Sequence, residues 1–487
     1  MKRNLTLYLL YDNNDCYKLL ADKLGKNSNV KEVILIGETE NEIGFKCIKS
    51  WNLFDSETMK SIASKTKSDY ALIQIKRGKI IPGQFFIERI LTAAENTSAG
   101  LVYCDFYEQD GVQLTPHPLI DYQSGSIRDD FDFGSFVMIE REALRKAAKS
   151  VKNDVKYSGF YTLRLAISRQ NSIFRIPELL YTVEKEDREK TGEKQFNYVD
   201  PRNRDVQIEM ERSVTEHLKK LKAFLSPGSK KLNLGALKFD YEASVIIPVK
   251  NRERTIADSV ASALEQKTSF KFNLIVVDNH STDETTKILD EFSNNNNRVI
   301  HIIPERKDLQ IGGCWNEAIF HKLCGKFAIQ LDSDDLYKDQ STLQKIVDKF
   351  YEERCGMVIG SYQLTDYDLN EVPPGVVDHR EWSEDNGKNN ALRINGLGAP
   401  RAFFTPLLRD IKFPNVSYGE DYSVVLAISR YYKIGRIYEP IYICRRWEGN
   451  TDSSLSIEQE NRNNFYKDKI RTIEISARKQ FIIGNNR

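Results

Sequence analysis

The chain has 487 residues, of which 71 are Lys or Arg and 70 are Asp or Glu, so its formal net charge is +1. A composition of 40% hydrophobic, 10% aromatic and 29% charged residues is typical of a globular protein and excludes disordered, collagen-like and coiled-coil chains. The near-neutral charge argues against nucleic acid as the partner, because nucleic-acid-binding domains are usually strongly basic. At ~100–200 residues per domain, this length predicts about two to four domains.

The seven cysteines are scattered and contain no Cys-x-x-Cys pair, which favours neither a disulfide framework nor a zinc site. The first apolar run, Leu5–Leu10, is too short for the core of a signal peptide. No stretch approaches the ~18 apolar residues of a membrane-spanning helix. We therefore expect a cytoplasmic protein. Peripheral contact with the inner face of a membrane and formation of a homo-oligomer are both compatible with this sequence.

The sequence contains two related halves. The pentapeptide Leu-Ala-Ile-Ser-Arg occurs at 165–169 and again at 426–430, and the apolar run at 70–75 resembles the run at 327–331. The matches keep their order along the chain, which indicates two copies of one α/β domain. We expect the following segments: a first domain at 1–190, a helical and charged linker at 191–238, a second domain at 239–455 and a C-terminal helix at 456–487.

The second copy shows apolar strands that alternate with helices. Strands are expected at 245–247, 274–277, 299–303 and 326–331, and helices at 255–266 and 282–292. Ser281 and Glu284 predict a capping box for the second of these helices. Such alternation is typical of a mostly parallel, Rossmann-type sheet covered on both faces. Ligands of these sheets bind at the carboxyl ends of the strands, where the polar residues of this sequence gather.

Three carboxylates, those of Asp332, Asp334 and Asp335, directly follow the strand at 326–331. They repel one another unless a cation offsets their charge, and oxygen ligands of this kind suit Mg²⁺ or Mn²⁺. An acidic turn that caps the next helix explains the same residues. For this tetrapeptide alone, the helix cap is the better explanation.

Further acidic and basic residues also lie at strand or helix ends. Asp278 follows the strand at 274–277 and lies outside the capping box, so it either meets a base or ribose or caps the helix. Glu420 and Asp421 head an apolar helix, where they either stabilise its N-terminus or supply a general base. Arg446 ends a later strand and either binds phosphate oxygens or is a solvated surface charge.

Four segments, in this order, resemble the family 2 glycosyltransferases of GT-A fold. They are 244–252, 276–283, 331–335 and 419–421. The resemblance covers most of 243–450 and implies transfer of a sugar, with inversion, from a nucleotide-sugar donor that is commonly UDP-linked. The acceptor is expected to be a hydroxyl of a saccharide or lipid-linked saccharide, in the synthesis of a bacterial surface polysaccharide or glycolipid.

The resemblance also implies how the donor is bound. Pro248, Asn251 and Asp278 would line the nucleoside pocket, with Asp278 on the base. Asp332 and Asp334 would form the Asp-x-Asp element that meets ribose, a Mn²⁺ or Mg²⁺ ion and the diphosphate.

On the same pattern, Asp421, with Glu420 beside it, would be the catalytic base. Many members place a His after the Arg of the C-terminal motif, but this chain has Trp447 there, which leaves the metal's third protein ligand open. The glycine-containing loop at 395–401 is expected on the acceptor side, because glycine allows close approach of a sugar. Trp382 is expected either to stack on a sugar ring or to lie in the core.

The first copy has different residues at these positions. Lys76-Arg77-Gly78-Lys79 corresponds to 332–335, and Gly37 corresponds to Asp278. Because these residues cannot build a metal-dependent transferase site, we expect a degenerate domain used for docking, dimerisation or acceptor binding. The basic residues alternatively form a small anion site, although a solvated basic turn is the simpler explanation.

Two other classes of protein remain as alternatives. In a non-catalytic carbohydrate-binding or scaffold protein, neither copy would have a catalytic site. The acidic residues of the second copy argue against this alternative. A sugar nucleotidyltransferase shares a related sheet but usually has a glycine-rich loop after its first strand, and residues 249–254 contain no glycine.

Overall fold

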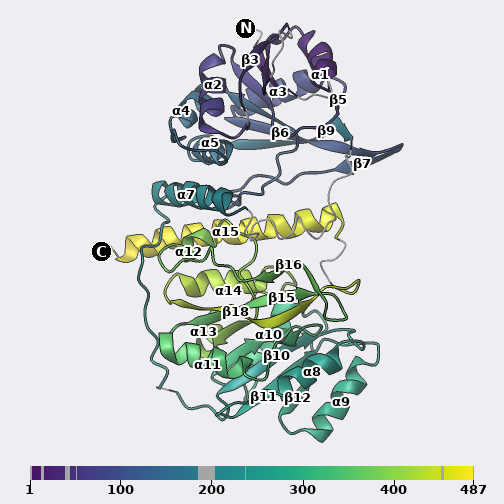
Figure 1. The fold of residues 1–487 in the computed structure, drawn as a ribbon, viewed down its shortest axis with the longest axis vertical. Coiled ribbons are helices and arrows are strands. Elements are labelled where there is room, and N and C mark those ends of the chain that lie inside the picture. The colour runs from purple at the N-terminus through teal and green to yellow at the C-terminus, as the bar shows by residue number, and fades with distance from the viewer. Residues whose placement is uncertain are drawn as a thin grey trace. The chain divides into compact units, whose positions relative to one another are not determined.

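The computed structural model describes residues 3–11, 16–38, 44–50, 52–184, 203–235, 237–450 and 455–485. The chain forms two compact units (Figure 1). Unit 1 comprises Met1–Lys194, Asn203–Phe224 and Ser456–Arg487, and Leu225–Leu455 is the main segment of unit 2. Residues 185–202, which include part of the expected charged linker, lie outside the described residues.

Unit 1 is built on a mixed sheet. Its strands are β1 (Leu5–Leu10), β2 (Val30–Ile36), β3 (Lys46–Ile48), β4 (Tyr70–Gln74), β5 (Ile80–Pro82), β6 (Leu101–Asp110), β7 (Gln113–His117), β8 (Phe136–Glu140) and β9 (Ile173–Glu184). Their order is β3-β2-β1-β4-β8-β6-β9-β5, and β7 pairs with β6. β1 runs parallel to β2 and β4, whereas β8 runs antiparallel to β4 and β6.

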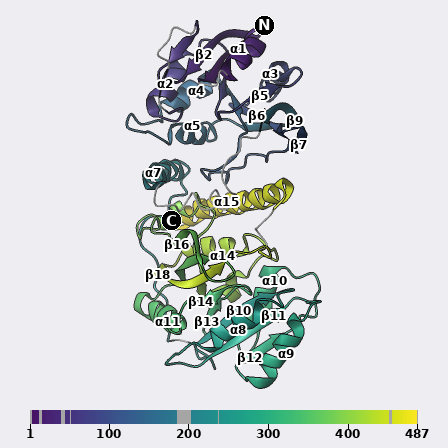
Figure 2. The ribbon, with the colours of Figure 1, turned by 45° about the vertical axis from the view of Figure 1, so that its right-hand side comes forward.

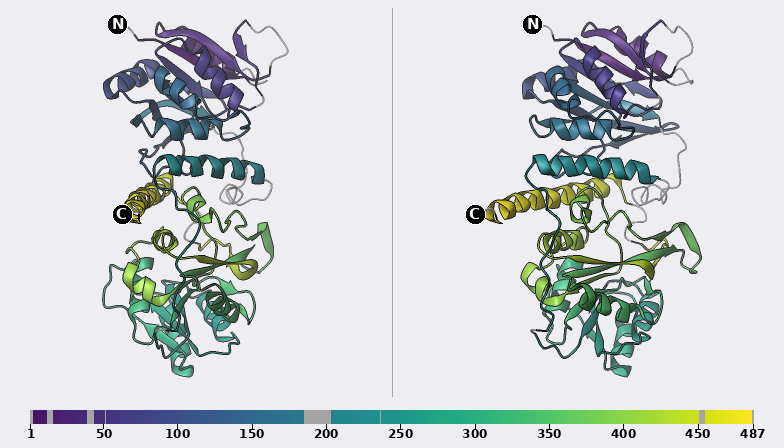
Figure 3. Two further views of the ribbon diagram at one scale, coloured as in Figure 1. Left: turned by 90° about the vertical axis from the view of Figure 1, so that its left-hand side faces the viewer. Right: turned by 60° about the vertical axis from the view of Figure 1, so that its left-hand side comes forward.

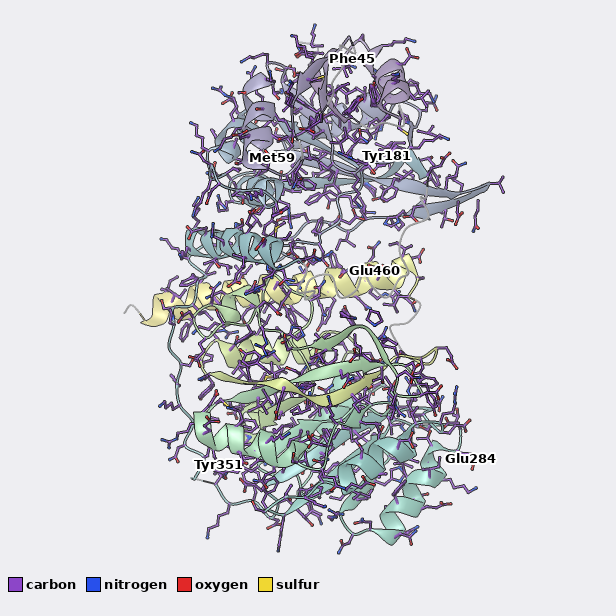
Figure 4. All side chains as sticks on the ribbon, viewed as in Figure 1. Phe45, Met59, Tyr181, Glu284, Tyr351 and Glu460 are labelled. Atoms are coloured by element: carbon purple, nitrogen blue, oxygen red, sulfur yellow. The ribbon has the colours of Figure 1, made fainter. Side chains whose placement is uncertain are left out.

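The core of unit 1 is aromatic. Tyr181 on β9, labelled in Figure 4, is 1% exposed, and its ring contacts those of Phe86, Phe106 and Phe136. The Tyr181 hydroxyl accepts a hydrogen bond from the Ser135 main-chain N–H at 2.6 Å. The Tyr181 hydroxyl is the one polar atom of these four rings, and this hydrogen bond gives it a partner, as burial in a stable core requires.

Seven helices of unit 1 are described. They are α1 (Cys16–Gly25), α2 (Ser56–Lys65), α3 (Phe86–Thr97), α4 (Arg141–Ala148), α5 (Gly159–Ile167), α7 (Arg204–Lys220) and α15 (Ile457–Asn485). Two of these helices come from segments expected outside the domains, α7 from the linker and α15 from the C-terminal segment.

Specific contacts hold α7 and α15 in unit 1. The Glu209 carboxylate on α7 accepts a hydrogen bond from the Tyr157 N–H at 2.8 Å, just before α5, and Figure 3 shows α7 beside that helix. On α15, Asp468 accepts a hydrogen bond from the Ser126 hydroxyl at 2.8 Å. α15 has 29 residues. Within the described ranges, neither this helix nor any other is long and apolar enough to cross a membrane.

Unit 2 repeats the sheet of unit 1. Its strands are β10 (Ala243–Val249), β11 (Phe272–Asp278), β12 (Val299–Ile302), β13 (Phe327–Gln330), β14 (Leu336–Tyr337), β15 (Met357–Thr365), β16 (Glu371–Val377), β17 (Arg401–Phe404) and β18 (Ile434–Arg445). Their order is β12-β11-β10-β13-β17-β15-β18-β14, with β16 paired to β15, so each strand matches one of unit 1. The expected α/β class, with two related sheets in tandem, is confirmed.

The helices of unit 2 cover its sheet, and Figure 2 shows α8 and α9 beside β10, β11 and β12. The helices are α8 (Ile256–Leu264), α9 (Thr285–Asn295), α10 (Ile311–Phe320), α11 (Thr342–Glu353), α12 (Gly387–Asn390), α13 (Thr405–Ile411) and α14 (Glu420–Ser429). The predicted capping box of α9 is wrong, because this helix begins at Thr285, whose N–H is accepted by Asp283 at 3.0 Å. The Ser281 hydroxyl instead accepts the Asn251 N–H at 2.9 Å and joins two loops.

The strand register brings the polar chain segments to one edge of the sheet. β10 is parallel to both β11 and β13, with Val249 opposite Asp278 and Ile246 opposite Gln330. The residues that follow these three strands therefore lie at the same carboxyl edge. The first turn of α14 carries two of the predicted site residues, Glu420 and Asp421.

Candidate active site

Gln330, the last residue of β13, organises the centre of the site. Its side-chain Nε2 donates to both carboxylate oxygens of Asp332, at 2.9 and 3.0 Å. Its Oε1 accepts the main-chain N–H of Arg401 at 3.1 Å and the Arg401 guanidinium at 3.3 Å. The Arg401 guanidinium in turn pairs with Asp421 Oδ2 at 2.5 Å. One amide thus connects the acidic turn after β13 with the acidic start of α14.

The acidic turn at 332–335 is held by main-chain contacts. The Asp332 N–H donates to the Tyr442 hydroxyl at 2.9 Å, and Asp335 Oδ1 accepts the Arg445 N–H at 2.9 Å. The Ser333 carbonyl accepts the Thr255 hydroxyl at 2.9 Å. β18 and the start of α8 therefore fix the turn from two sides.

The negative charge of the carboxyl groups in this turn is not fully compensated by neighbouring positive groups. Burial raises the pKa of Asp332 to about 6, against the effect of the Gln330 hydrogen bonds, and the Asp334 charge raises it further. Burial, followed by the charges of Asp334 and Asp332, raises the pKa of Asp335 well above its usual value. A cation at this position would offset that charge.

Asp334 is contacted on one of its two oxygens. Its Oδ2 accepts hydrogen bonds from the Asn450 amide at 3.2 Å and the Trp447 indole N–H at 3.4 Å, and Arg252 Nε lies at 3.8 Å. An indole N–H only donates, so Trp447 cannot take the place of the histidine that many family members have at this position. Because all three contacts fall on Oδ2, Asp334 Oδ1 is the atom best placed to ligate a metal ion.

The carboxylates of Asp332 and Asp334 fit a divalent ion whose remaining ligands come from substrate and water. Among the described residues, no group of three or more His, Cys, Asp or Glu side chains is arranged to hold a metal by itself. Mg²⁺ commonly uses one or two carboxylates together with substrate phosphates and water. Asp334 and Asp332, with their excess negative charge, meet that requirement.

Asp421 and Glu420 are adjacent but lie in different surroundings. The Asp421 side chain is 24% exposed, and its Oδ1 accepts the Tyr422 N–H at 2.6 Å. Glu420 is 9% exposed, and its Oε2 has no hydrogen-bond partner among the described residues. Burial and the Asp421 charge raise the pKa of Glu420 to about 8. Burial and the neighbouring charge therefore favour the protonated form of Glu420 over its carboxylate.

Asp278 is fully buried, and its side chain contacts the loop that follows it, the first turn of α9 and β12. Its Oδ1 accepts the Ser281 N–H at 2.9 Å, its Oδ2 accepts the Thr286 hydroxyl at 2.6 Å, and His301 Nε2 lies 3.6 Å from Oδ2. Although burial acts in the opposite direction, these contacts lower the pKa of Asp278. The structure thus accounts for this carboxylate, and its contact with a base stays a prediction.

The other two predicted nucleoside residues lie near the end of β10. Pro248 is half-buried opposite Val277 of β11. Asn251 is exposed, has a φ of 52°, and its Oδ1 accepts the Thr282 N–H at 2.8 Å. Both residues are at the carboxyl edge of the sheet, as expected.

The two arginines of the C-terminal Arg-Arg-Trp segment lie in different surroundings. The Arg445 guanidinium is buried and bonds the Asp334 carbonyl at 2.5 Å and Asp258 at 2.9 Å, so it supports the acidic turn. Arg446 is half-buried, and its main-chain N–H donates to the Thr365 carbonyl at 2.7 Å. Its role in phosphate binding stays a prediction.

Trp382 and Asn316 have structural surroundings. Trp382 is 7% exposed, and a Cβ on Gly387 would lie 2.6 Å from its ring, so Trp382 belongs to the core. The Asn316 amide donates to the Phe413 carbonyl at 2.8 Å and accepts the Phe413 N–H at 3.0 Å, which ties α10 to the chain after α13.

Comparisons with known proteins show which proteins unit 2 is similar to. Residues 244–409 match the sequence model described as Glycosyl transferase family 2. The chain is 28% identical over 218 residues to the UDP-Glc:alpha-D-GlcNAc-diphosphoundecaprenol beta-1,3-glucosyltransferase WfgD of Escherichia coli, which covers 45% of this chain and 80% of that protein. It is 27% identical over 127 residues to the O-antigen chain rhamnosyltransferase WbaN of Salmonella anatum, covering 26% of this chain and 38% of that protein.

A solved structure of S. aureus TarS 1-349 in complex with UDP-GlcNAc is 22% identical, with a TM-score of 0.39, and covers 47% of this chain and 66% of that chain. The chain thus spans most of WfgD but well under half of WbaN. Residues 244–409 are thus similar to glycosyl transferase family 2, and the relatives that this part of the chain matches are named glycosyltransferases.

Proposed function

We propose that the second domain, expected at 239–455, transfers a hexose with inversion from a UDP-sugar to an acceptor hydroxyl. The observation that carries this proposal is the connection of Asp332 through Gln330 and Arg401 to Asp421. A donor-binding carboxylate and a candidate base are thereby fixed relative to one another. Inversion needs such an arrangement, because one displacement requires the base and the leaving group to be held in a defined geometry.

Asp421 is the better candidate for the catalytic base. Its carboxylate is partly exposed and oriented by Arg401, so an acceptor hydroxyl can approach it. Glu420 is buried, and burial and the Asp421 charge raise its pKa to about 8, which favours its protonated form. In our proposal Asp421 takes the proton of the acceptor hydroxyl, and Glu420 shapes the start of α14.

A Mn²⁺ or Mg²⁺ ion held by Asp334 and Asp332 would neutralise charge that develops on the leaving diphosphate. Arg252 lies 3.8 Å from Asp334 Oδ2 and is a second positive group near that position. Pro248, Asn251 and Asp278 are proposed to shape the nucleoside end of the site, and Arg446 is proposed to contact the diphosphate.

The name of the WfgD relative states a UDP-glucose donor and a lipid-linked acceptor. On this basis we propose a UDP-sugar donor and a saccharide or lipid-linked saccharide acceptor, in bacterial surface polysaccharide or glycolipid synthesis. Unit 1 is proposed to lack transferase activity, because Lys76 and Gly78 follow β4 where Asp332 and Asp334 follow β13.

The test is a transfer reaction with a panel of UDP-sugars and saccharide acceptors, with the wild-type chain and Asp421→Asn. We expect a product of inverted anomeric configuration, and a loss of about 10²–10⁴-fold in kcat for Asp421→Asn, the usual contribution of a general base. Donor binding should survive this substitution. Retention of configuration, or an unchanged kcat in Asp421→Asn, would overturn the proposal.

A further inference from the structure

Unit 1 contains a cavity at the edge of its sheet that corresponds to the candidate active site of unit 2. The cavity has a volume of about 340 Å³, within the range of small-molecule sites. Its lining residues come from the ends of β1, β2 and β4 and from the segment before α2. The apolar ones are Leu10, Ile36, Leu53, Phe54 and Ile75.

Among the described residues of this lining, Arg77 is the one basic side chain. Of the three basic residues in its turn, Lys76 pairs with Asp132 at 2.6 Å and Lys79 pairs with Glu184 at 2.5 Å. The Arg77 side chain is exposed and has no hydrogen bond or ion pair with the described residues. The basic turn is therefore not simply solvated: two of its charges are paired, and the third lies at the cavity.

The other polar side chains of the described lining already form hydrogen bonds with main-chain carbonyl groups. The Ser50 hydroxyl donates to the Asn52 carbonyl at 2.9 Å, and the Asn52 amide donates to the Lys156 carbonyl at 2.9 Å. A ligand would thus meet apolar walls and one guanidinium, which matches a small molecule with a ring body and one anionic group. A guanidinium pairs well with phosphate oxygens.

The charge at this edge is the opposite of that in unit 2. Gly37 lies at the end of β2 where Asp278 ends β11, and it has no room for a side chain, since a Cβ would come within 2.8 Å of Tyr11 Cβ. No carboxylate lines the cavity among the described residues. A phosphate would meet the Arg77 guanidinium here, in contrast to the acidic turn of unit 2.

We propose that this cavity binds a phosphate monoester without a metal ion, with the phosphate on Arg77 and the ring against the apolar wall. The chemistry is shared by nucleoside monophosphates and sugar phosphates. The proposal does not depend on the activity proposed for unit 2, because every residue that carries it belongs to unit 1.

The test measures binding by calorimetry with the full chain in EDTA, using uridine monophosphate, glucose 1-phosphate and inorganic phosphate as separate probes. An Asp334→Asn background removes the metal ligand of unit 2. We expect at least one phosphate monoester to bind, and Arg77→Gln to weaken it by about tenfold or more, the effect of losing one charge-assisted hydrogen bond. Lys79→Gln is the matched control, because it removes one charge from the same turn and should leave affinity within about twofold.

The three probes distinguish a nucleoside monophosphate from a sugar phosphate as the ligand. Binding of uridine monophosphate alone would assign a nucleotide, and binding of both esters would assign the phosphate monoester in general. The proposal is overturned if neither ester binds, or if inorganic phosphate binds as tightly as the esters, since the apolar wall would then contribute nothing. Equal affinity in the wild-type and Arg77→Gln chains, or equal losses in Arg77→Gln and Lys79→Gln, would also overturn it.

Discussion

Gln330 accepts two hydrogen bonds from Arg401 on one oxygen, at 3.1 Å from the main-chain N–H and 3.3 Å from the guanidinium. Its amide nitrogen simultaneously donates to both oxygens of Asp332. One side chain therefore contacts both the acidic turn and Arg401, which pairs with Asp421.

Replacing Gln330 by Leu should impair catalysis. The substitution leaves Arg401 and Asp332 without these partners, and unpaired polar groups of this kind cost about 1–3 kcal/mol, or about 5–150-fold in kcat/KM. We expect the loss to fall mainly on kcat, because Asp421 loses its fixed orientation. Steady-state kinetics with saturating donor measures this directly.

Gln74→Leu is the matched control for that experiment. Gln74 ends β4 as Gln330 ends β13, and it is also buried, with bonds of 3.0 Å to the Leu10 N–H and the Lys76 carbonyl. We expect a lower unfolding temperature but an unchanged kcat. A comparable fall in kcat in Gln74→Leu would show that the Gln330 effect is not specific to the proposed site.

Glu420→Gln should change how the stability of the metal-free protein depends on pH. Burial raises the pKa of Glu420 from 4.5 to about 8 in the folded protein, so the folded state holds the proton more tightly than the unfolded state. Stability from this group is present below the unfolded pKa and is lost as pH rises towards about 8.

The full shift corresponds to about 5 kcal/mol at most, so Glu420→Gln should unfold at a higher temperature than the wild type at about pH 9. At about pH 5 the two chains should unfold at similar temperatures. Thermal unfolding in EDTA at both pH values measures the difference. A difference that does not change with pH would mean that Glu420 is ionised in the folded protein.

Trp447→His should strengthen the response to Mn²⁺. The Trp447 indole N–H lies 3.4 Å from Asp334 Oδ2, so an imidazole at this position would bring a nitrogen lone pair close to the proposed metal ligands. We expect half-maximal activation at a lower Mn²⁺ concentration than in the wild type.

Trp447→Phe separates this effect from the loss of the indole. Phe keeps a ring that can pack on Arg254, whose guanidinium carbon lies 5.1 Å from the Trp447 ring, but it offers no metal ligand. The Mn²⁺ concentration for half-maximal activation should not fall in Trp447→Phe. Equal activation curves for the His and Phe variants would place the metal away from Trp447.

The fold of unit 2 was largely predictable because its strands are continuous apolar runs and its helices carry one buried face. Within unit 2, the strand expected at 274–277 is observed as β11 and the helix expected at 255–266 as α8. The start of α9 was not predictable from the capping pattern, since Ser281 forms a bond to Asn251, a residue 30 positions away. Long-range contacts of this kind leave no local signal in a sequence.

The acidic residues of the candidate site can be proposed from the sequence because carboxylates at strand ends are conspicuous, but no local pattern marks the residues that connect them. In the sequence, Gln330 is part of an apolar run, although a polar residue that ends a buried strand in both copies is a usable signal. Arg401 lies within a glycine-containing loop. Its pairing with Asp421 depends on β17 lying beside β13, which only the fold reveals.

Calorimetric titration with a panel of UDP-sugars, with and without Mn²⁺, tests most directly whether unit 2 is a metal-dependent glycosyltransferase. We predict that at least one UDP-sugar binds only when Mn²⁺ is present, and that Asp334→Asn abolishes this binding while the chain stays folded. If no UDP-sugar binds in either condition, or if Asp334→Asn binds as tightly as the wild type, unit 2 does not bind its donor through a metal ion on Asp334.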